Sequence, residues 1–123
     1  METKFNFESQ ICTTREQSER LLALGLKKET ADMHYRYFGR DSKGEVKHYS
    51  EPSVGRPFSY DVPAWSLHRL IEMTPSDLRG YMCKNIFDEK YAIDEQFDEL
   101  IATIGYYIKE GYFKKEYLEN GNY

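Results

Sequence analysis

The chain is poor in the residues that make paired thiol sites, because its 123 residues include only two cysteines, Cys12 and Cys83, and neither belongs to a CxxC pair. This excludes the spacing of zinc ribbons and of dithiol redox sites. No stretch approaches the roughly 20 apolar residues of a membrane span, and the first ten residues, METKFNFESQ, lack the apolar segment of a signal peptide. We therefore expect a cytoplasmic protein with reduced cysteines and no membrane contact.

Recognisable catalytic and metal-binding motifs are also missing. The histidines His34, His48 and His68 follow neither an HxH nor an HExxH spacing, so the sequence predicts no metal site. We expect His34 to be a solvated side chain on a sheet face. Nothing in the sequence brings a cysteine or serine beside a histidine and an orienting acid. We therefore predict a protein that is not an enzyme, with no catalytic residue, cofactor or metal.

Aromatic residues are plentiful, at 15% of the chain, and 40% of all residues are hydrophobic. Disordered chains are poor in aromatics, so this composition indicates a folded protein. A chain of this length fits one domain and buries about two thirds of its unfolded surface. The sequence predicts a single domain over residues 1–123, with frayed ends at about 1–8 and 119–123.

The net charge of −4 is spread unevenly. Residues 27–69 carry eight basic and six acidic side chains, whereas residues 70–123 carry six basic and eleven acidic ones. An acidic protein is not a strong nucleic-acid binder by bulk charge. The excess of basic residues at 27–69 is still compatible with a local basic face in the middle of the chain.

The first helix is marked by two overlapping capping boxes, Thr13 with Glu16 and Thr14 with Gln17. In such a box, a hydroxyl accepts a hydrogen bond from a free backbone N–H while the acid or amide reaches back to the cap. Gly25 suits the left-handed position that ends a helix. A helix is therefore expected from Thr13 or Thr14 to about residue 24.

Alternating aromatic residues at 33–38, MHYRYF, predict a strand. A turn at 39–45 would allow residues 46–49 to return as the second strand of a hairpin. Residues 50–63 are rich in proline, glycine and serine, so we expect a loop there.

The only tryptophan, Trp65, precedes an apolar helical pattern. With Ser66 as the N-cap, Trp65 and Leu70 occupy the positions of a hydrophobic staple, and Pro75 ends the helix. The alternative start has Pro63 as the first helical residue. The staple predicts a packing role for Trp65, and the alternative is a surface anchor in a binding site.

The last third predicts a second hairpin, from residues 81–87 and 91–93, followed by a long helix from Asp94 that ends at Gly111. One short turn of helix is expected in the tail. The order helix, hairpin, helix, hairpin, helix indicates an α+β fold. We predict a small antiparallel sheet built from two hairpins, with about three helices mainly on one face. The apolar stripe of the long helix is Phe97, Leu100, Ile101, Ile104 and Ile108.

A resemblance follows from the strings TADM at 30–33 and PAWSL at 63–67, with Pro75 after the second. This pattern resembles a set of short uncharacterised proteins encoded in prophages and other mobile elements of gut Bacteroidetes. The resemblance covers most of residues 20–113. It implies a mobile-element or phage-like origin, and it carries over no catalytic residue because no activity is attached to the family.

The predicted hairpin at 34–49 interleaves aromatic and basic residues. An excess of tyrosine, with tryptophan and arginine, is typical of protein interfaces. We therefore predict binding of a protein partner, whose identity and assembly state the sequence does not encode. The alternative is single-stranded nucleic acid, because aromatic rings stack on bases while basic groups meet phosphates. The candidate binding residues are Tyr35, Arg36, Tyr37, Arg40, Lys47, Tyr49 and Trp65.

Overall fold

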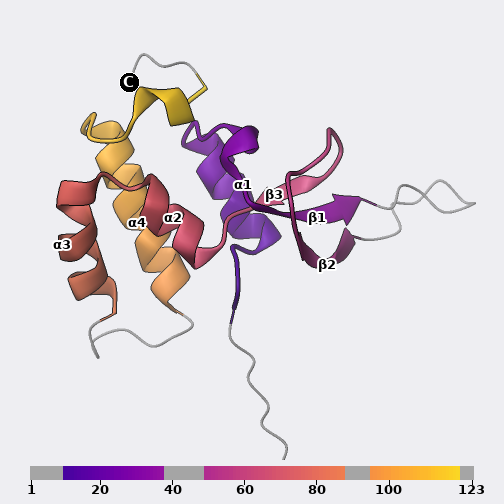
Figure 1. Ribbon diagram of the computed structural model, residues 1–123, viewed down its shortest axis with the longest axis horizontal. Coiled ribbons are helices and arrows are strands. Elements are labelled where there is room, and N and C mark those ends of the chain that lie inside the picture. Colours follow the sequence, from indigo (N-terminus) through magenta and orange to yellow (C-terminus); the bar gives the residue numbers. More distant parts are fainter. Residues whose placement is uncertain (1–9, 38–48, 88–94, 120–123) are drawn as a thin grey trace, which may run out of the picture.

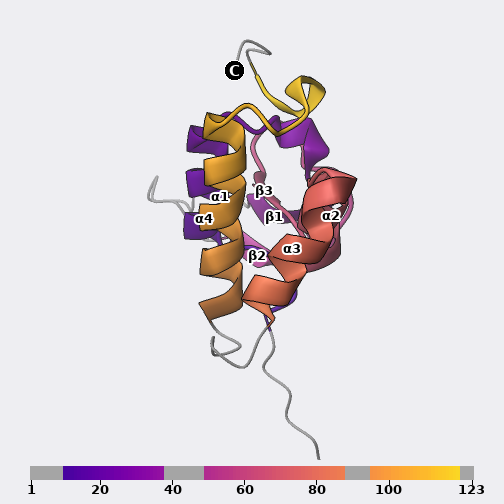
Figure 2. The same ribbon diagram turned by 90° about the vertical axis from the view of Figure 1, so that its left-hand side faces the viewer.

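The computed structural model in Figure 1 describes residues 10–37, 49–87 and 95–119, and these form an α+β domain. In chain order the elements are α1 (Arg15–Ala23), the 3-10 turn η1 (Lys28–Thr30), β1 (Met33–Tyr37), β2 (Tyr49–Val54), β3 (Val62–Ala64), α2 (Leu67–Met73), α3 (Ser76–Ile86), α4 (Gln96–Lys109) and the 3-10 turn η3 (Lys115–Tyr117). The predicted fold class, an antiparallel sheet with helices, is confirmed. Figures 1 and 2 show α2, α3 and α4 gathered at one end of the molecule, the sheet at the other, and α1 beside α4 between them.

The sheet has three strands in the order β2-β1-β3, and both pairings are antiparallel. Tyr35 of β1 lies opposite Pro52 on one side and Val62 on the other. The expected loop over 50–63 is therefore wrong in part, since β2 and β3 both take residues from it. The prediction of a loop relied on the prolines, but Pro52 and Pro63 lie in the edge strands β2 and β3, where a missing backbone N–H is tolerated. Residues 46–48 lie outside the described residues.

Helix α1 begins at the second of the two predicted capping boxes. Thr14 Oγ1 accepts from the Gln17 N–H at 3.1 Å, and the Gln17 side chain accepts from the Thr14 N–H at 3.0 Å. Thr13 instead accepts from the Trp65 N–H at 3.1 Å, which ties the start of α1 to the end of β3. Gly25, with φ of 103°, ends the helix as predicted.

Helix α2 confirms Ser66 as the N-cap, because its hydroxyl accepts from the Arg69 N–H at 3.1 Å. The strand predicted at 81–87 is wrong, since α3 runs from Ser76 to Ile86. Pro75 both ends α2 and precedes α3, and Met82 and Ile86, four residues apart, place one helical face in the core. The predicted return strand at 91–93 lies outside the described residues.

Helix α4 buries every residue of its predicted apolar stripe. Its N-cap position is Glu95, and Asp94 lies outside the described residues. Gly111, with φ of 79°, follows the helix as expected. The tail adds the turn η3, and the Glu119 N–H donates to Gly25 O at 2.8 Å. Residues 1–9 and 120–123 lie outside the described residues, so the fraying expected at the two ends stays a prediction.

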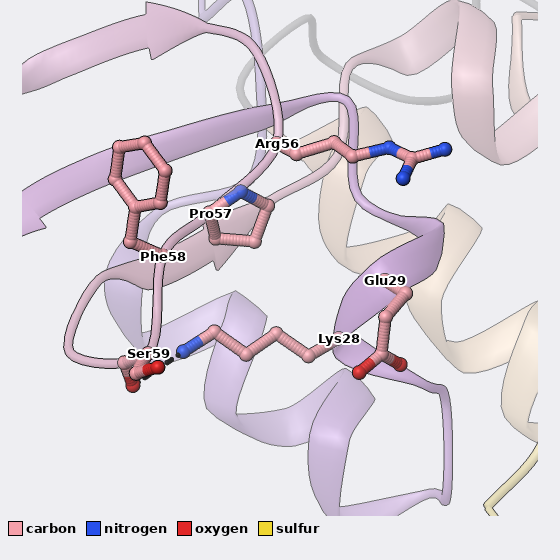
Figure 3. Close-up of a pocket in the computed structure, with 6 residues that line it drawn as sticks. All are labelled: Lys28, Glu29, Arg56, Pro57, Phe58 and Ser59. Carbon is pink, nitrogen blue, oxygen red and sulfur yellow. Dashed lines mark hydrogen bonds between the residues drawn. The ribbon is translucent and has the colours of Figure 1, made fainter.

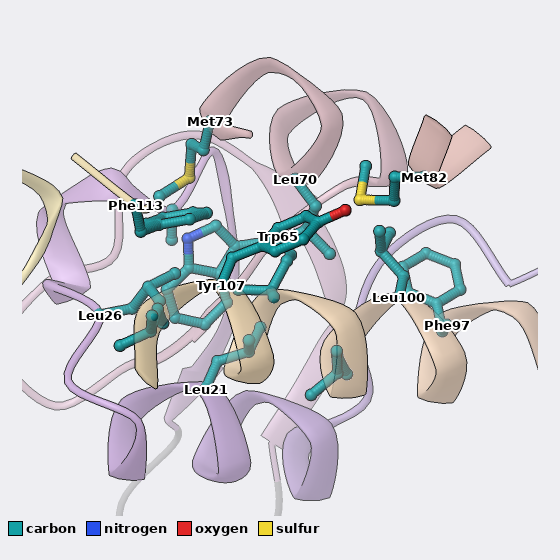
Figure 4. Close-up of a cluster of buried hydrophobic side chains, with 14 of the residues drawn as sticks. Leu21, Leu26, Trp65, Leu70, Met73, Met82, Phe97, Leu100, Tyr107 and Phe113 are labelled. Atoms are coloured by element: carbon teal, nitrogen blue, oxygen red, sulfur yellow. The ribbon is translucent and has the colours of Figure 1, made fainter. Parts of the chain in front are cut away.

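Trp65 lies in the main core with no exposed surface, in the same cluster as Leu70, Met73 and Phe113 (Figure 4). Its indole Nε1–H donates to Thr30 Oγ1 at 3.0 Å, so the polar atom of the ring has a partner. The complete burial of Trp65 and Leu70 fits the predicted staple. A buried indole cannot meet a partner in this structure, so Trp65 is removed from the candidate binding residues.

The two strings that carry the sequence resemblance are joined in space. Asp32 accepts from the Ser66 N–H at 2.9 Å and from the Ser66 hydroxyl at 2.6 Å. Met33 pairs with Ala64 across β1 and β3. The pattern TADM…PAWSL therefore describes how the sheet is attached to the start of α2, which is architecture and not a binding site.

Candidate binding surfaces

Four side chains from distant parts of the sequence form a continuous row at one end of the sheet, and we call them the aromatic row: Arg15, Tyr49, Tyr37 and Tyr60. The Arg15 guanidinium carbon lies 4.5 Å from the Tyr49 ring centroid. The Tyr49 and Tyr37 rings are 5.6 Å apart, and the Tyr37 and Tyr60 rings 6.5 Å apart. The predicted residues Tyr37 and Tyr49 are thus brought together.

The opposite face of β1 carries a second pair, because successive side chains of a strand alternate between faces. The Arg36 guanidinium carbon lies 5.9 Å from the centroid of Phe58. Phe58 and Tyr60 leave 68% and 81% of their surface exposed, so this end of the sheet offers two large aromatic groups to solvent. The predicted residues Arg40 and Lys47 lie outside the described residues.

The loop that carries Phe58 and Tyr60 is fixed by Asp61. Its carboxylate accepts from the Phe58 N–H at 2.9 Å and from the Tyr37 N–H at 3.2 Å. Burial alone would raise the pKa of Asp61, but these two hydrogen bonds, with the electrostatic effects of His34 and Arg36, lower it overall. The ionised carboxylate therefore holds the loop against the end of β1.

Tyr35, another predicted binding residue, points inward. Its hydroxyl donates to Thr13 O at 2.8 Å and lies 3.8 Å from Cys12 Sγ. Burial, followed by the neighbouring Cys12, raises the pKa of Tyr35. Burial likewise raises the pKa of the Cys12 thiol, which is the opposite of what an activated thiolate requires. Tyr35 therefore serves to attach β1 to the segment before α1.

His34 is buried, so the expectation of a solvated histidine is wrong. Its Nδ1 lies 3.0 Å from Gly55 O, beneath the turn that leaves β2. Among the described residues, no three His, Cys, Asp or Glu side chains lie close enough to hold a metal ion. None of the helices in the described ranges has the length and apolar character that a membrane span requires.

Within the described ranges, the arginines at the sheet end have no ionic partner. Among the described residues, ion pairs join Arg20 to Asp98 and Arg69 to Glu72, and none includes Arg15, Arg36 or Arg56. This leaves three guanidinium groups near the aromatic row and the exposed Phe58 without a carboxylate partner within the described ranges.

A hollow of about 170 Å³ beside Phe58 is lined by residues 28–29 and 56–59. Figure 3 shows that its charged groups diverge, because Lys28 Nζ reaches Ser59 O at 2.9 Å while the Arg56 guanidinium points to the other end. Glu29 adds a negative charge between them. These groups do not converge on one position, so the hollow is not a small-molecule site.

A second exposed aromatic surface lies on the helices, and we call it the tyrosine surface: Tyr81, Tyr106 and Tyr112. Between 51% and 69% of each side chain is in solvent. Tyr106 and Tyr112 meet edge to face with centroids 6.5 Å apart. Tyr112 also borders a hollow of about 350 Å³ with Pro75, Asp77 and Leu78. This surface was not predicted, because residue 81 was assigned to a strand.

Tyr107 lies beneath the tyrosine surface and connects it to the core. Its ring is 6.0 Å from Tyr106 and 6.2 Å from Tyr112, and only 4% of its surface is exposed. Burial raises the pKa of Tyr107, with smaller contributions from Tyr81 and Tyr106. Its hydroxyl has no hydrogen-bond partner among the described residues. The buried Tyr107 ring therefore supports Tyr106 and Tyr112, and Tyr81 is exposed on the neighbouring helix α3.

The two surfaces differ in charge and in how they are supported. The aromatic row includes Arg15, and Arg36 lies at Phe58 on the opposite face of β1, whereas the tyrosine surface has Asp77 at its border. Neither surface is part of the main hydrophobic core that contains Trp65. Comparison with protein-family models, with curated proteins and with solved structures finds no match to this chain.

Proposed function

We propose that the chain is a non-enzymatic binding domain whose tyrosine surface docks a protein partner. The observation that carries the proposal is the exposure of Tyr81, Tyr106 and Tyr112 at the α3–α4 end of the molecule, with the Tyr106 and Tyr112 rings in edge-to-face contact. Tyrosine is enriched at the centre of protein interfaces, because it buries a large area at little cost in side-chain entropy.

Rigid support strengthens this proposal. Tyr106 and Tyr112 pack on the buried ring of Tyr107, and Tyr106 belongs to α4, the longest helix of the described residues. Rings that are already held in place lose little freedom on binding, which favours affinity. The hollow beside Tyr112 adds a recess for a side chain of the partner.

We also propose a mobile-element origin and a cytoplasmic location. The first rests on the resemblance of the strings at 30–33 and 63–67, and the second on the composition of the chain. Because those strings join the sheet to α2, they indicate that the chain shares its fold with the proteins it resembles. The choice of partner then depends on the exposed side chains.

The test is affinity capture from a Bacteroidetes lysate treated with nuclease, with the wild-type chain and the double variant Tyr81→Ala/Tyr106→Ala as baits. We expect a partner that the wild type retains and the double variant loses, as identified by mass spectrometry. Tyr60→Ala is the matched control, because it removes an even more exposed tyrosine from the other surface. A partner that both variants retain would place the interface elsewhere, and self-association measured by sedimentation would identify a second copy as the occupant.

A further inference from the structure

We propose that the sheet end is a separate site for single-stranded nucleic acid, which extends around the loop from Tyr60 and Arg15 on one face of the sheet to Phe58 and Arg36 on the other. This site does not depend on the proposed protein partner, because it lies on the sheet and not on the tyrosine surface. Figure 3 shows Phe58 on the loop between β2 and β3, which places it beside the end of β1.

The arginines are held in a geometry suited to phosphate. Arg15 lies over Tyr49 and Arg36 lies near the ring of Phe58. A guanidinium stacked on a ring keeps its N–H edge free for bidentate hydrogen bonds to an oxyanion. Neither arginine spends that edge on a carboxylate of the described residues.

Helix stability does not account for Arg15. It is the first residue of α1, and a positive charge at that end opposes the helix dipole. The Arg15 side chain lies over the ring of Tyr49, which belongs to β2. An acidic or neutral residue at position 15 would make the helix itself more stable. A positive charge that lowers the stability of its own helix and lies beside aromatic rings supports a role for Arg15 in binding an anion.

The exposed rings favour nucleic acid over an acidic peptide. Phe58 and Tyr60 present most of their surface to solvent within three residues of Asp61, whose hydrogen bonds fix the loop. Bases stack on such rings whatever their sequence, while carboxylates of a peptide gain nothing from them. Only unpaired bases expose their faces, so the expected ligand is a single strand and not a duplex.

Local charge outweighs net charge here. The chain carries −4 in total, but its acidic excess lies in residues 70–123, which build most of α2, α3 and α4. The sheet end stands apart from these helices in Figure 1. Phosphates bound there are therefore far from most of the negative charge.

The experiment uses fluorescence anisotropy with the full chain and a labelled oligothymidylate of about 12 nucleotides, which is within the usual site size. We expect binding that weakens roughly sevenfold between about 50 and 200 mM salt, if Arg15 and Arg36 each neutralise about one phosphate. Tyr60→Ala and Phe58→Ala should each weaken binding about tenfold, since one stacked base contributes on the order of 1–3 kcal/mol.

Two further variants separate binding from folding. Arg15→Gln should weaken binding while the chain stays folded, because it removes a charge that opposes the helix dipole. Tyr81→Ala, on the tyrosine surface, should leave binding unchanged, so it is the matched control for Tyr60→Ala.

Four results would overturn the proposal. They are no binding at low salt, equal affinity for a duplex of the same length, full competition by polyglutamate, and equal losses in Tyr60→Ala and Tyr81→Ala. Competition by polyglutamate would identify an acidic protein segment as the ligand. None of these results bears on capture of a protein by the tyrosine surface, so the two proposals fail separately.

Discussion

Replacement of Trp65 by phenylalanine tests whether this residue belongs to the core or to a binding site. The change removes the pyrrole part of an indole that is completely buried. Roughly 40 Å² of lost apolar burial costs about 1 kcal/mol, and the cavity left behind adds on the order of 1 kcal/mol. Loss of the Nε1–H bond to Thr30 costs about 1 kcal/mol more. We expect Trp65→Phe to lower the free energy of unfolding by about 2–3 kcal/mol.

Phenylalanine is more informative than alanine at this position. Trp65→Ala would cost about 3–5 kcal/mol, which is a large part of the 5–15 kcal/mol typical of a whole domain. The Trp65→Phe protein should still fold, with a melting temperature about 6–15 °C lower. Circular dichroism follows the transition, because the variant lacks the only tryptophan of the chain.

Tyr60→Ala is the control, since a residue that is 81% exposed should change the free energy of unfolding by no more than about 0.5 kcal/mol. An unchanged melting temperature for Trp65→Phe, together with loss of a binding partner, would refute the core assignment. In that case the staple with Leu70 would not stabilise the start of α2.

Three further changes probe the polar contacts inside the domain. Asp61→Asn should destabilise the fold by about 1–3 kcal/mol at pH 7. Because the pKa of Asp61 is lowered in the folded state, its stabilising contribution is present above the ordinary carboxyl pKa near 4 and is lost as the pH falls through the folded pKa. Urea titrations should therefore show the difference in unfolding free energy between wild type and variant shrinking toward pH 3. Asp32→Asn should cost about 1.5–3 kcal/mol, because the two bonds from Ser66 end on different carboxylate oxygens and one of these becomes an NH2 group that cannot accept; a similar urea midpoint for both proteins would contradict this. Tyr107→Phe should raise the free energy of unfolding by about 1 kcal/mol, as it removes a buried hydroxyl without a partner among the described residues; a lower denaturation midpoint would show that the hydroxyl is bonded.

Local chemistry predicted the ends of several elements. Thr14, Ser66 and Gly25 act within one turn of the backbone, so their side chains or lack of one determine where a helix starts or stops. The apolar stripe of α4 was equally predictable, because its period extends over four turns.

Short apolar segments were harder to assign. Residues 81–87 contain Met82 and Ile86 at helical spacing, but a run of this length also fits a strand. Pro75 added to the error, since a proline that stops one helix also suits the start of the next. The strands β2 and β3 were hidden by Pro52 and Pro63, which are compatible with a strand only at the edge of a sheet.

The binding surfaces depend on tertiary contacts that no local pattern encodes. Residues 15, 37, 49 and 60 meet only because β2 folds back on β1 and α1 lies beside the sheet. Tyr37 and Tyr49 were found from their place in the hairpin, whereas Tyr60 was assigned to the loop over 50–63. The burial of Trp65 was correctly favoured, because the staple pattern is local.

The two prolines also determine how this sheet can meet other chains. The Arg36 N–H donates toward β2, to Ser50 Oγ, and the Tyr37 N–H donates toward β3, to Asp61. By alternation along β1, Tyr35 turns away from β2 and His34 turns away from β3. Their partners Pro52 and Pro63 therefore direct their nitrogens outward, where an added strand would seek an N–H donor. Each described edge thus lacks a central donor, which protects the domain from strand addition and fibril growth and leaves recognition to its side chains.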